Sequence, residues 1–199
     1  MNATEPAARD TPIRGQSTHD QLTHDELTRA ILAREPFRPG RRGDGTLLAN
    51  YFDGHRVLGE PRLLIALADA LCRAIVPTGA DLVAGEVAAG AQLATAISLA
   101  STRYERILEA RGIRRATKEY GVTGRLTSPA AAGSRFAVVD DVAGTGAAAR
   151  RCVEALHEAG HQISGVFVLL DRGQGAAENL ARLRIPLVSL FRLDELAPA

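Results

Sequence analysis

The chain lacks several features that define extracellular, membrane-spanning and nucleic-acid-binding proteins. Its two cysteines, Cys72 and Cys152, lie in helical patterns with no Cys-x-x-Cys or His-rich setting, so neither a disulfide nor a metal site is expected. No apolar run reaches about 20 residues and no secretory segment opens the chain, which predicts neither a membrane span nor export. The formal net charge of +1 gives no broad attraction for nucleic acid. We therefore expect a cytoplasmic protein with no membrane and no nucleic-acid partner.

The composition is otherwise that of one globular domain. The chain has 199 residues, of which 46% are hydrophobic and 24% charged, so it can bury a sizeable core. Residues 1–18 are polar and contain Pro6, Pro12 and Gly15, which predicts a disordered tail. Residues 19–199 are expected to fold as a single domain.

Apolar periodicity places the main elements. Leucine and isoleucine recur at helical spacing over residues 20–33 and again over residues 63–75, which predicts two helices, with a Pro/Gly/Arg loop at 36–45 between them. Beyond them, strands and helices are expected to alternate at strand 81–85, helix 91–99, strand 136–139, helix 147–159, strand 163–170, helix 175–183 and strand 185–190. Such alternation indicates an α/β fold with a parallel sheet flanked by helices.

Two acidic residues follow the most strongly predicted strand. Residues 136–139 form a short apolar run rich in β-branched side chains, which is typical of a strand buried on both faces. Asp140 and Asp141 come directly after it, at the edge where open α/β sheets bind ligands. Adjacent carboxylates at that edge can hold the hydroxyls of a sugar.

A glycine turn follows the acids. Gly144 and Gly146 allow a tight turn with exposed backbone N–H groups, and the alanine-rich segment from Ala147 predicts a helix whose N-terminus favours anions. Gly144-Thr145-Gly146 matches neither the Gly-Lys-Ser/Thr ATP loop nor the Gly-x-Gly-x-x-Gly dinucleotide fingerprint. The sequence therefore predicts a sugar-phosphate site, the alternative being a solvated strand end followed by a helix cap.

The stretch from Val138 to Gly146 resembles the phosphoribosyl-diphosphate (PRPP) signature of type I phosphoribosyltransferases, and residues 45 to 196 look like their orotate phosphoribosyltransferase branch. The resemblance implies a type I phosphoribosyltransferase-like parallel sheet flanked by helices, with a small N-terminal hood from about residues 19–60. It implies Mg²⁺-dependent transfer of the phosphoribosyl group from PRPP to orotate, giving orotidine 5′-monophosphate and diphosphate. The metal would be held mainly by substrate and water, and homodimers would share active sites.

A basic segment carries part of this resemblance. Arg114 to Gly121 is similar to the family's mobile Arg-Lys-x-x-Lys-x-His-Gly loop, with Arg115 in place of a lysine and Tyr120 in place of the commoner histidine. The resemblance implies that Arg114, Arg115, Lys118 and Tyr120 contact PRPP, partly from the neighbouring subunit. A basic, solvated connection is the alternative interpretation. The catalytic residues that the resemblance implies are Lys118, Asp140 and Asp141.

Two further motifs concern the acceptor base. Asp171-Arg172-Gly173 follows an apolar strand, and the resemblance assigns Arg172 to orotate, whose carboxylate suits a guanidinium fork. Tyr51 and Phe52 resemble an aromatic element near the pyrimidine, although hood or core positions are equally compatible with them. Arg172 paired only with Asp171 at a strand end is the alternative for that arginine.

The PRPP contacts would be largely backbone contacts. The resemblance assigns the 5′-phosphate to Gly144, Thr145, Gly146, Ala147 and Ala148, and the diphosphate to the loop with Ala88, Ala89 and Gly90. The family usually has hydroxyl side chains at the positions of Gly144 and Ala147, and a cation close before Tyr51. These departures leave open a phosphoribosyltransferase for a modified pyrimidine or other base in specialised metabolism, and a non-catalytic PRPP-binding regulator. A purine-using enzyme of the same fold is disfavoured by Arg172.

Overall fold

The computed structural model describes residues 22–41, 45–118, 120 and 124–196. Its main sheet has the strand order β5-β4-β3-β6-β7-β8. The strands of this sheet are β3 (Leu82–Glu86), β4 (Glu109–Lys118), β5 (Gly124–Leu126), β6 (Arg135–Ala143), β7 (Gln162–Asp171) and β8 (Leu187–Arg192). All neighbours are parallel except β5, which is antiparallel to β4. The predicted α/β fold with a parallel sheet is confirmed.

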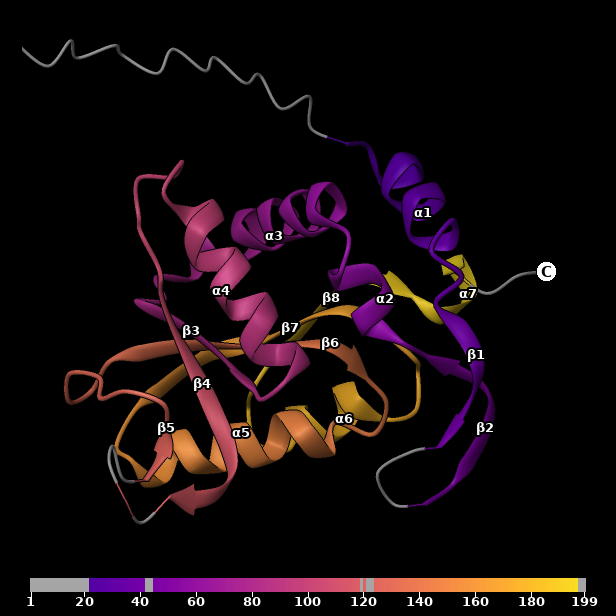
Figure 1. Ribbon diagram of the computed structural model, residues 1–199. Coiled ribbons are helices and arrows are strands. Elements are labelled where there is room, and N and C mark those ends of the chain that lie inside the picture. Colours follow the sequence, from indigo (N-terminus) through magenta and orange to yellow (C-terminus); the bar gives the residue numbers. More distant parts are fainter. Residues whose placement is uncertain (1–21, 42–44, 119, 121–123, 197–199) are drawn as a thin grey trace, which may run out of the picture.

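Helices cover both faces of this sheet, as Figure 1 shows. One face packs against α3 and α4 and the other against α5 and α6. The helical segments are α1 (His24–Leu32), α2 (Gly54–Leu58), α3 (Pro61–Ile75), the 3₁₀ turn η1 (Val76–Thr78), α4 (Ala89–Ser101), α5 (Ala147–Glu158), α6 (Ala176–Ala181) and α7 (Leu193–Leu196). No helix within the described ranges is both long and apolar enough to cross a membrane.

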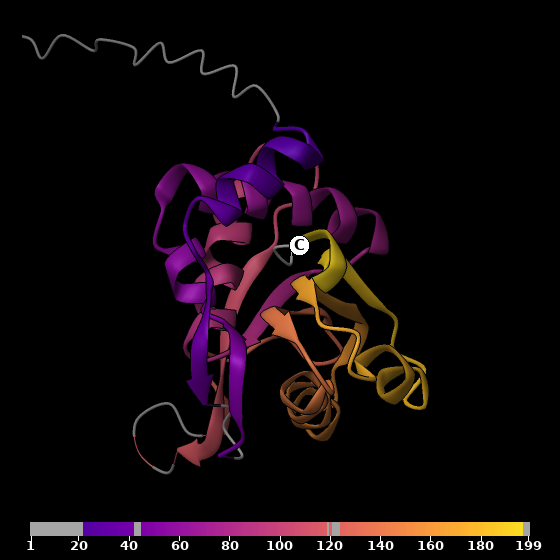
Figure 2. The same ribbon diagram turned by 90° about the vertical axis from the view of Figure 1, so that its right-hand side faces the viewer.

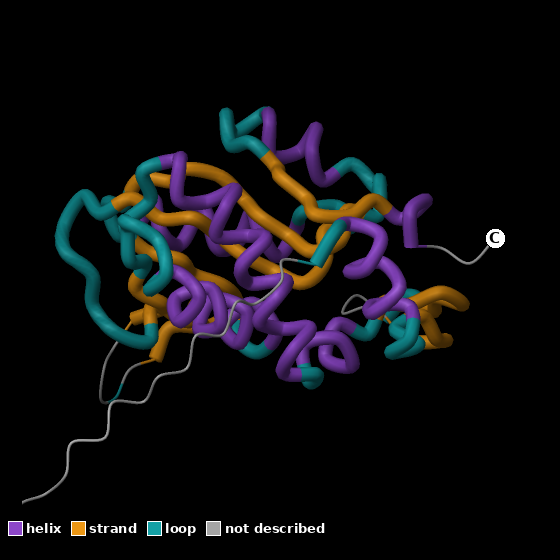
Figure 3. The backbone as a smooth tube through the Cα atoms, turned by 90° about the horizontal axis from the view of Figure 1, so that it is seen from above, coloured by secondary structure: helices purple, strands orange, loops and turns teal. Residues whose placement is uncertain are grey.

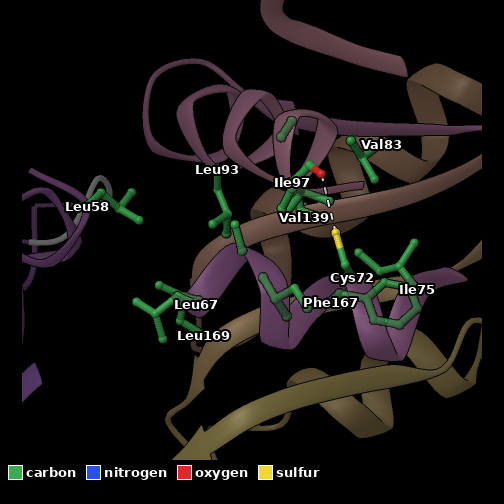
Figure 4. Close-up of a cluster of buried hydrophobic side chains, with 14 of the residues drawn as sticks. Leu58, Leu67, Cys72, Ile75, Val83, Leu93, Ile97, Val139, Phe167 and Leu169 are labelled. Carbon is green, nitrogen blue, oxygen red and sulfur yellow. Dashed lines mark hydrogen bonds between the residues drawn. The ribbon is translucent and has the colours of Figure 1, made fainter. Parts of the chain in front are cut away.

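The central strands are buried on both faces, as the apolar run predicted. Val139 of β6 belongs to the core beneath α3 and α4, whereas Val138 belongs to the core above α5. This alternation is the period of two that a strand imposes on its side chains. Figure 4 shows the first core, where the Cys72 thiol donates a hydrogen bond to the Ile97 carbonyl at 3.3 Å. Both cysteines are free and buried, and burial raises the pKa of each thiol to about 12.

A two-stranded antiparallel sheet stands apart from the main sheet, formed by β1 (Phe37–Arg41) and β2 (Leu47–Phe52), as Figures 2 and 3 show. The predicted loop at 36–45 is therefore wrong in part, because β1 lies inside it. Tertiary pairing overrides the poor strand propensity of this segment: Phe37 pairs with Phe52, and their rings pack edge to face 5.4 Å apart. Gly40 fits this pairing because a Cβ there would lie 2.7 Å from the Tyr51 Cβ.

Several boundaries differ from the predictions for identifiable reasons. Helix α1 begins at His24 because Thr23 caps it in a capping box with Glu26. Strand β6 runs on to Ala143, since its pairing with β7 continues after its pairing with β3 has ended. The basic segment predicted as a loop is β strand through Lys118, because β5 pairs with it. The predicted tail at residues 1–18 lies outside the described residues.

Candidate active site

The site lies where the strand order reverses. The chain passes from β3 outward to β4 and then returns to β6 on the other side of β3, so β3 and β6 form a topological switch point. The pairing of these two strands ends at Ala84 and Val138, while β6 continues beside β7 for five more residues. A cavity of about 430 Å³ opens beside this extension of β6.

Many of the residues singled out in the sequence line this one cavity. Asp140 comes from β6, and Arg172 follows β7. The glycine turn and the start of α5 contribute Gly144, Thr145, Gly146, Ala147 and Ala148. Strand β2 contributes Tyr51 and Phe52, and β4 contributes Arg115. Segments more than 100 residues apart in the sequence thus converge on one volume.

Other predicted residues lie elsewhere. The guanidinium of Arg114 donates to the carbonyls of Gly124 and Leu126, at 3.1 and 2.6 Å, and so ties β5 to β4. Tyr120 is 76% exposed. The side chain of Lys118 is not among the described parts of the structure.

The residues predicted to approach the diphosphate, Ala88, Ala89 and Gly90, form the N-cap and first residues of α4 and do not belong to the cavity lining. The main chain is nevertheless close to β6 at this point, since a Cβ on Gly90 would lie 2.8 Å from the Val139 carbonyl oxygen. The Val87–Ala88 peptide bond is cis. The close approach of Gly90 to Val139 brings this loop to the switch point through its backbone.

The two aspartates form one partly buried acidic pair. The backbone N–H of Asp141 donates to Asp140 Oδ1 at 3.0 Å. Burial, followed by the charge of Asp141, raises the pKa of Asp140 well above its ordinary value. Burial also raises the pKa of Asp141, while its hydrogen bond with Asp140 and the nearby His55 oppose this rise. The ionised form of this pair is therefore stabilised by a ligand that donates hydroxyl hydrogen bonds to it or carries positive charge.

The glycine turn is held in place by helix α6. Gly146 adopts a left-handed conformation with φ of +78° and forms the N-cap of α5. The amide of Asn179 donates to the Thr145 carbonyl at 3.0 Å, and Gly146 packs against Ala176. The first-turn N–H groups of a helix have no carbonyl of their own helix to bind, so this turn presents donors to an anion.

The sequence interpretation gave no role to a buried carboxylate that contacts two arginines of the cavity lining. Glu86, at the end of β3, has a side chain only 6% exposed, yet it accepts hydrogen bonds from two arginines. Arg151 donates from Nε and Nη2, at 3.2 and 3.0 Å, and Arg115 donates from Nε at 3.2 Å. Glu86 was visible as an acid after a strand, but its partner Arg151 lies 65 residues away and carried no local signal.

The hood supplies a cation that the local sequence does not contain. Arg38 of β1 pairs with Tyr51 of β2 in the register and forms an ion pair with Asp53. No cation precedes Tyr51 closely in sequence, but the hairpin brings one to the opposite strand. A hairpin partner of this kind can be found only once the β1 strand is known.

The donor set suits a magnesium ion that arrives with an anionic substrate. Within the described ranges, no group of three or more His, Cys, Asp or Glu side chains could hold a metal ion. Asp140 and Asp141 offer hard carboxylate oxygens, which Mg²⁺ prefers, and Mg²⁺ commonly takes one or two carboxylates together with phosphate oxygens and water.

No family model matches the chain. An orotate phosphoribosyltransferase of Bradyrhizobium sp. is 32% identical over 174 residues, covering 83% of this chain and 92% of that protein. The crystal structure of Mycobacterium tuberculosis orotate phosphoribosyltransferase with Fe(III) dicitrate has a TM-score of 0.75 at 24% identity, covering 88% of this chain and 99% of that one. The structure of the Mycobacterium tuberculosis enzyme with PRPP has a TM-score of 0.71 at 23% identity, covering 87% and 91%. The Bradyrhizobium match relates the chain by sequence to orotate phosphoribosyltransferases, and the two Mycobacterium tuberculosis structures share its fold.

Proposed function

The chain belongs to the orotate phosphoribosyltransferase family, and we propose that its cavity transfers the phosphoribosyl group of PRPP to orotate. The reaction gives orotidine 5′-monophosphate and diphosphate, a step in pyrimidine nucleotide synthesis. One observation carries the assignment: a single cavity gathers Asp140, the glycine turn and Arg172. These groups suit, in turn, a ribose, a phosphate and a planar carboxylate.

The aspartates act on the ribose. In the transfer, the bond from the ribose anomeric carbon to diphosphate oxygen breaks, a bond to a ring nitrogen of orotate forms, and that nitrogen loses its proton. Positive charge develops on the ribose as the diphosphate leaves. Asp140 and Asp141 orient the ring hydroxyls, and their charge stabilises the transition state more than the ground state.

The turn and helix α5 hold the 5′-phosphate. Backbone N–H groups from Gly144 to Ala148 point toward an anion at the helix N-terminus. Thr145 is the one residue of this segment with a polar side chain, so the backbone carries most of the binding.

The diphosphate binds together with Mg²⁺ and next to the basic residues of strand β4. When bound, Mg²⁺ would neutralise charge on the leaving group and would be held mainly by substrate oxygens and water, with the carboxylates of Asp140 and Asp141 as the protein oxygens available to it. Arg115 lines the cavity of its own chain. The backbone of Ala88, Ala89 and Gly90 approaches the diphosphate from the end of β3.

The acceptor base lies between Arg172 and the hood. The guanidinium fork of Arg172 pairs with the orotate carboxylate, which distinguishes orotate from uracil and from purines. Tyr51 and Phe52 provide aromatic surface from β2 on the same cavity.

Lys118 completes the site from a second copy of the chain. It lies near the tip of the β4–β5 arm, and a cation there would cover the leaving diphosphate. The active unit is accordingly a homodimer with shared sites, and it acts in the cytoplasm on small-molecule substrates.

The test is a turnover assay with PRPP and Mg²⁺ and, separately, orotate, uracil and hypoxanthine. We expect diphosphate release with orotate and little with the other two bases, since neither carries a carboxylate for Arg172. Release with none of the three, together with PRPP binding measured by calorimetry, would favour a non-catalytic PRPP-binding protein. Release only with a different pyrimidine would favour a specialised enzyme.

A further inference from the structure

Arg151 lines the cavity next to the phosphate turn, although no motif singles it out. It lies four residues after Ala147, the first residue of α5, so the two residues share one face of the helix. Long side chains in a helix lean back toward its N-terminus. The guanidinium of Arg151 is thereby directed toward the N-terminal end of the helix, where the backbone of Gly144 to Ala148 presents its N–H groups.

The Arg151 guanidinium is held in one orientation by Glu86. Nε and Nη2 form a fork onto the two carboxylate oxygens, at 3.2 and 3.0 Å. The third nitrogen of the guanidinium, Nη1, is not part of this fork and lies on the opposite edge of the planar group from Nε. The Glu86 side chain is 6% exposed whereas that of Arg151 is 41% exposed, so the carboxylate is the buried anchor and the cation faces the open side.

The charges of this cluster favour an anion. Glu86 contributes one negative charge and the two arginines two positive charges, which leaves this three-residue cluster with one positive charge. Gly144 and Ala147 offer no side-chain donor to a phosphate, and Ala147 is small enough to leave room above the first helical turn. Arg151, a charged donor one turn later on the same face of α5, suits a phosphate bound above this first turn.

We propose that Arg151, oriented by the buried carboxylate of Glu86, binds the 5′-phosphate of PRPP. Glu86 is a positioning residue that acts through Arg151 and Arg115 and does not itself touch the substrate. The inference rests on the proposed function, because it assigns a further binding residue to the same cavity. Arg151 supplies the charged hydrogen bond that the side chains of the turn do not provide.

The test measures two fragments of PRPP by titration calorimetry, ribose 5-phosphate for the 5′-phosphate site and inorganic diphosphate with Mg²⁺ for the leaving-group site. Arg151→Ala should weaken ribose 5-phosphate binding about tenfold or more, the usual size of a lost charged hydrogen bond, and change diphosphate binding less than about twofold. In turnover, the KM for PRPP should rise while the KM for orotate stays unchanged.

Arg150→Ala is the matched control, because Arg150 is the neighbouring arginine on α5 and pairs at the surface with Glu154 at 3.5 Å. It should bind ribose 5-phosphate as the wild type does. Equal affinities in the Arg150 and Arg151 variants would overturn the proposal.

Further variants separate binding from folding. Removing Arg151 alone leaves Glu86 with one partner, which can destabilise the protein. The double variant Glu86→Gln/Arg151→Gln removes the buried carboxylate together with its Arg151 partner, and it should fold and still bind ribose 5-phosphate about tenfold more weakly. Wild-type affinity in this double variant would contradict the assignment. Arg151→Lys keeps the charge without the fork and should recover part of the affinity.

Glu86→Gln should weaken ribose 5-phosphate binding less than Arg151→Ala does, because the cation remains but is no longer held. An equal or larger loss would mean that Glu86 binds the ligand directly and would contradict its positioning role. Ribose 5-phosphate binding needs no acceptor base, so a wild type without orotate turnover overturns the proposed function alone. Normal turnover with no effect at Arg151 overturns this inference alone.

Discussion

The carboxylate of Asp141 occupies the space that any side chain at residue 54 would need. A Cβ built on Gly54 would lie 1.8 Å from Asp141 Oδ2 and 2.7 Å from its Cγ. Gly54 is the first residue of α2, so the hood packs its main chain directly onto the acidic pair of β6. The position of the second aspartate is therefore fixed by a glycine 87 residues earlier in the sequence.

Gly54→Ala should displace the Asp141 carboxylate and lower activity. A shift of about 1 Å in a catalytic group can cost about 100-fold in rate, so we expect kcat to fall between about tenfold and about 100-fold. Steady-state kinetics with PRPP and orotate measure this fall. Gly79→Ala is the control, because a Cβ there meets nothing within 4 Å and its cost should appear in stability alone. Equal kcat in the two variants would contradict this role for Gly54.

Asp140→Asn should stabilise the protein while reducing its activity. The pKa of Asp140 is raised on folding, so the folded state holds more protons than the unfolded state between the ordinary aspartate pKa and the raised one. The free energy of unfolding therefore falls as pH rises through this window. Above the window, the folded protein bears the full cost of the ionised Asp140 carboxylate. Asparagine carries no such cost. At pH 7.5 we expect a Tm a few degrees above wild type and a kcat at least about 100-fold lower.

The Tm difference should shrink as the pH falls toward the ordinary aspartate pKa of about 4, because the ionised carboxylate is then less populated in the unfolded state and its cost in the folded state becomes small. Thermal melts from pH 4 to 8 give this profile. The surface variant Asp194→Asn, at a residue paired with Arg192 at 3.6 Å, should show no comparable trend. A Tm below wild type at pH 7.5 would show that the ionised carboxylate is stabilising instead.

Lys118→Ala should lower kcat with a smaller effect on the KM for orotate, since its charge is needed as the diphosphate leaves. When this variant is mixed with Asp141→Asn, heterodimers should regain activity, because one of their two sites has both intact residues. No recovery on mixing would mean that Lys118 acts within its own chain.

Lys118 is the only lysine in the sequence, which gives an independent check. An amine-selective acetylating reagent should inactivate the wild type, and PRPP with Mg²⁺ should protect it. Lys118→Arg, which has no side-chain amine, should resist the reagent. Inactivation of this variant at the wild-type rate would place the sensitive amine elsewhere.

Arg172→Ala should raise the KM for orotate at least tenfold and leave the KM for PRPP within about twofold, since one charged fork is lost from the acceptor side. Arg172→Lys should behave similarly, because an ammonium cannot form the bidentate pair. Arg182→Ala, at an exposed position after α6, is the control. Equal rises in both KM values would assign Arg172 to a structural role.

The sequence was sufficient to predict those parts of the site that are encoded in a local sequence pattern. The apolar run before Asp140 predicted a doubly buried strand, and the glycines after it predicted a turn into α5; the structure contains both. Parallel order followed from the alternation of strands and helices. These features depend on residues within about 15 positions of one another, which a single pass along the chain can detect.

Features made by distant partners could not be predicted in this way. Strand β1 contains Pro39 and Gly40 and becomes a strand only through its pairing with β2. The link between Glu86 and Arg151 joins two elements 65 residues apart, and only the fold brings them together. The close contact of Gly54 with Asp141 likewise has no signal in either local sequence.

The most direct test of the central claim is titration calorimetry of the wild-type protein with PRPP in the presence of Mg²⁺. If the aspartate pair and the glycine turn bind one activated pentose, heat should appear with a stoichiometry of one PRPP per chain, and it should be strongly reduced in an Asp140→Asn/Asp141→Asn variant. The absence of any heat from the folded wild type, or equal binding by that double variant, would contradict the account.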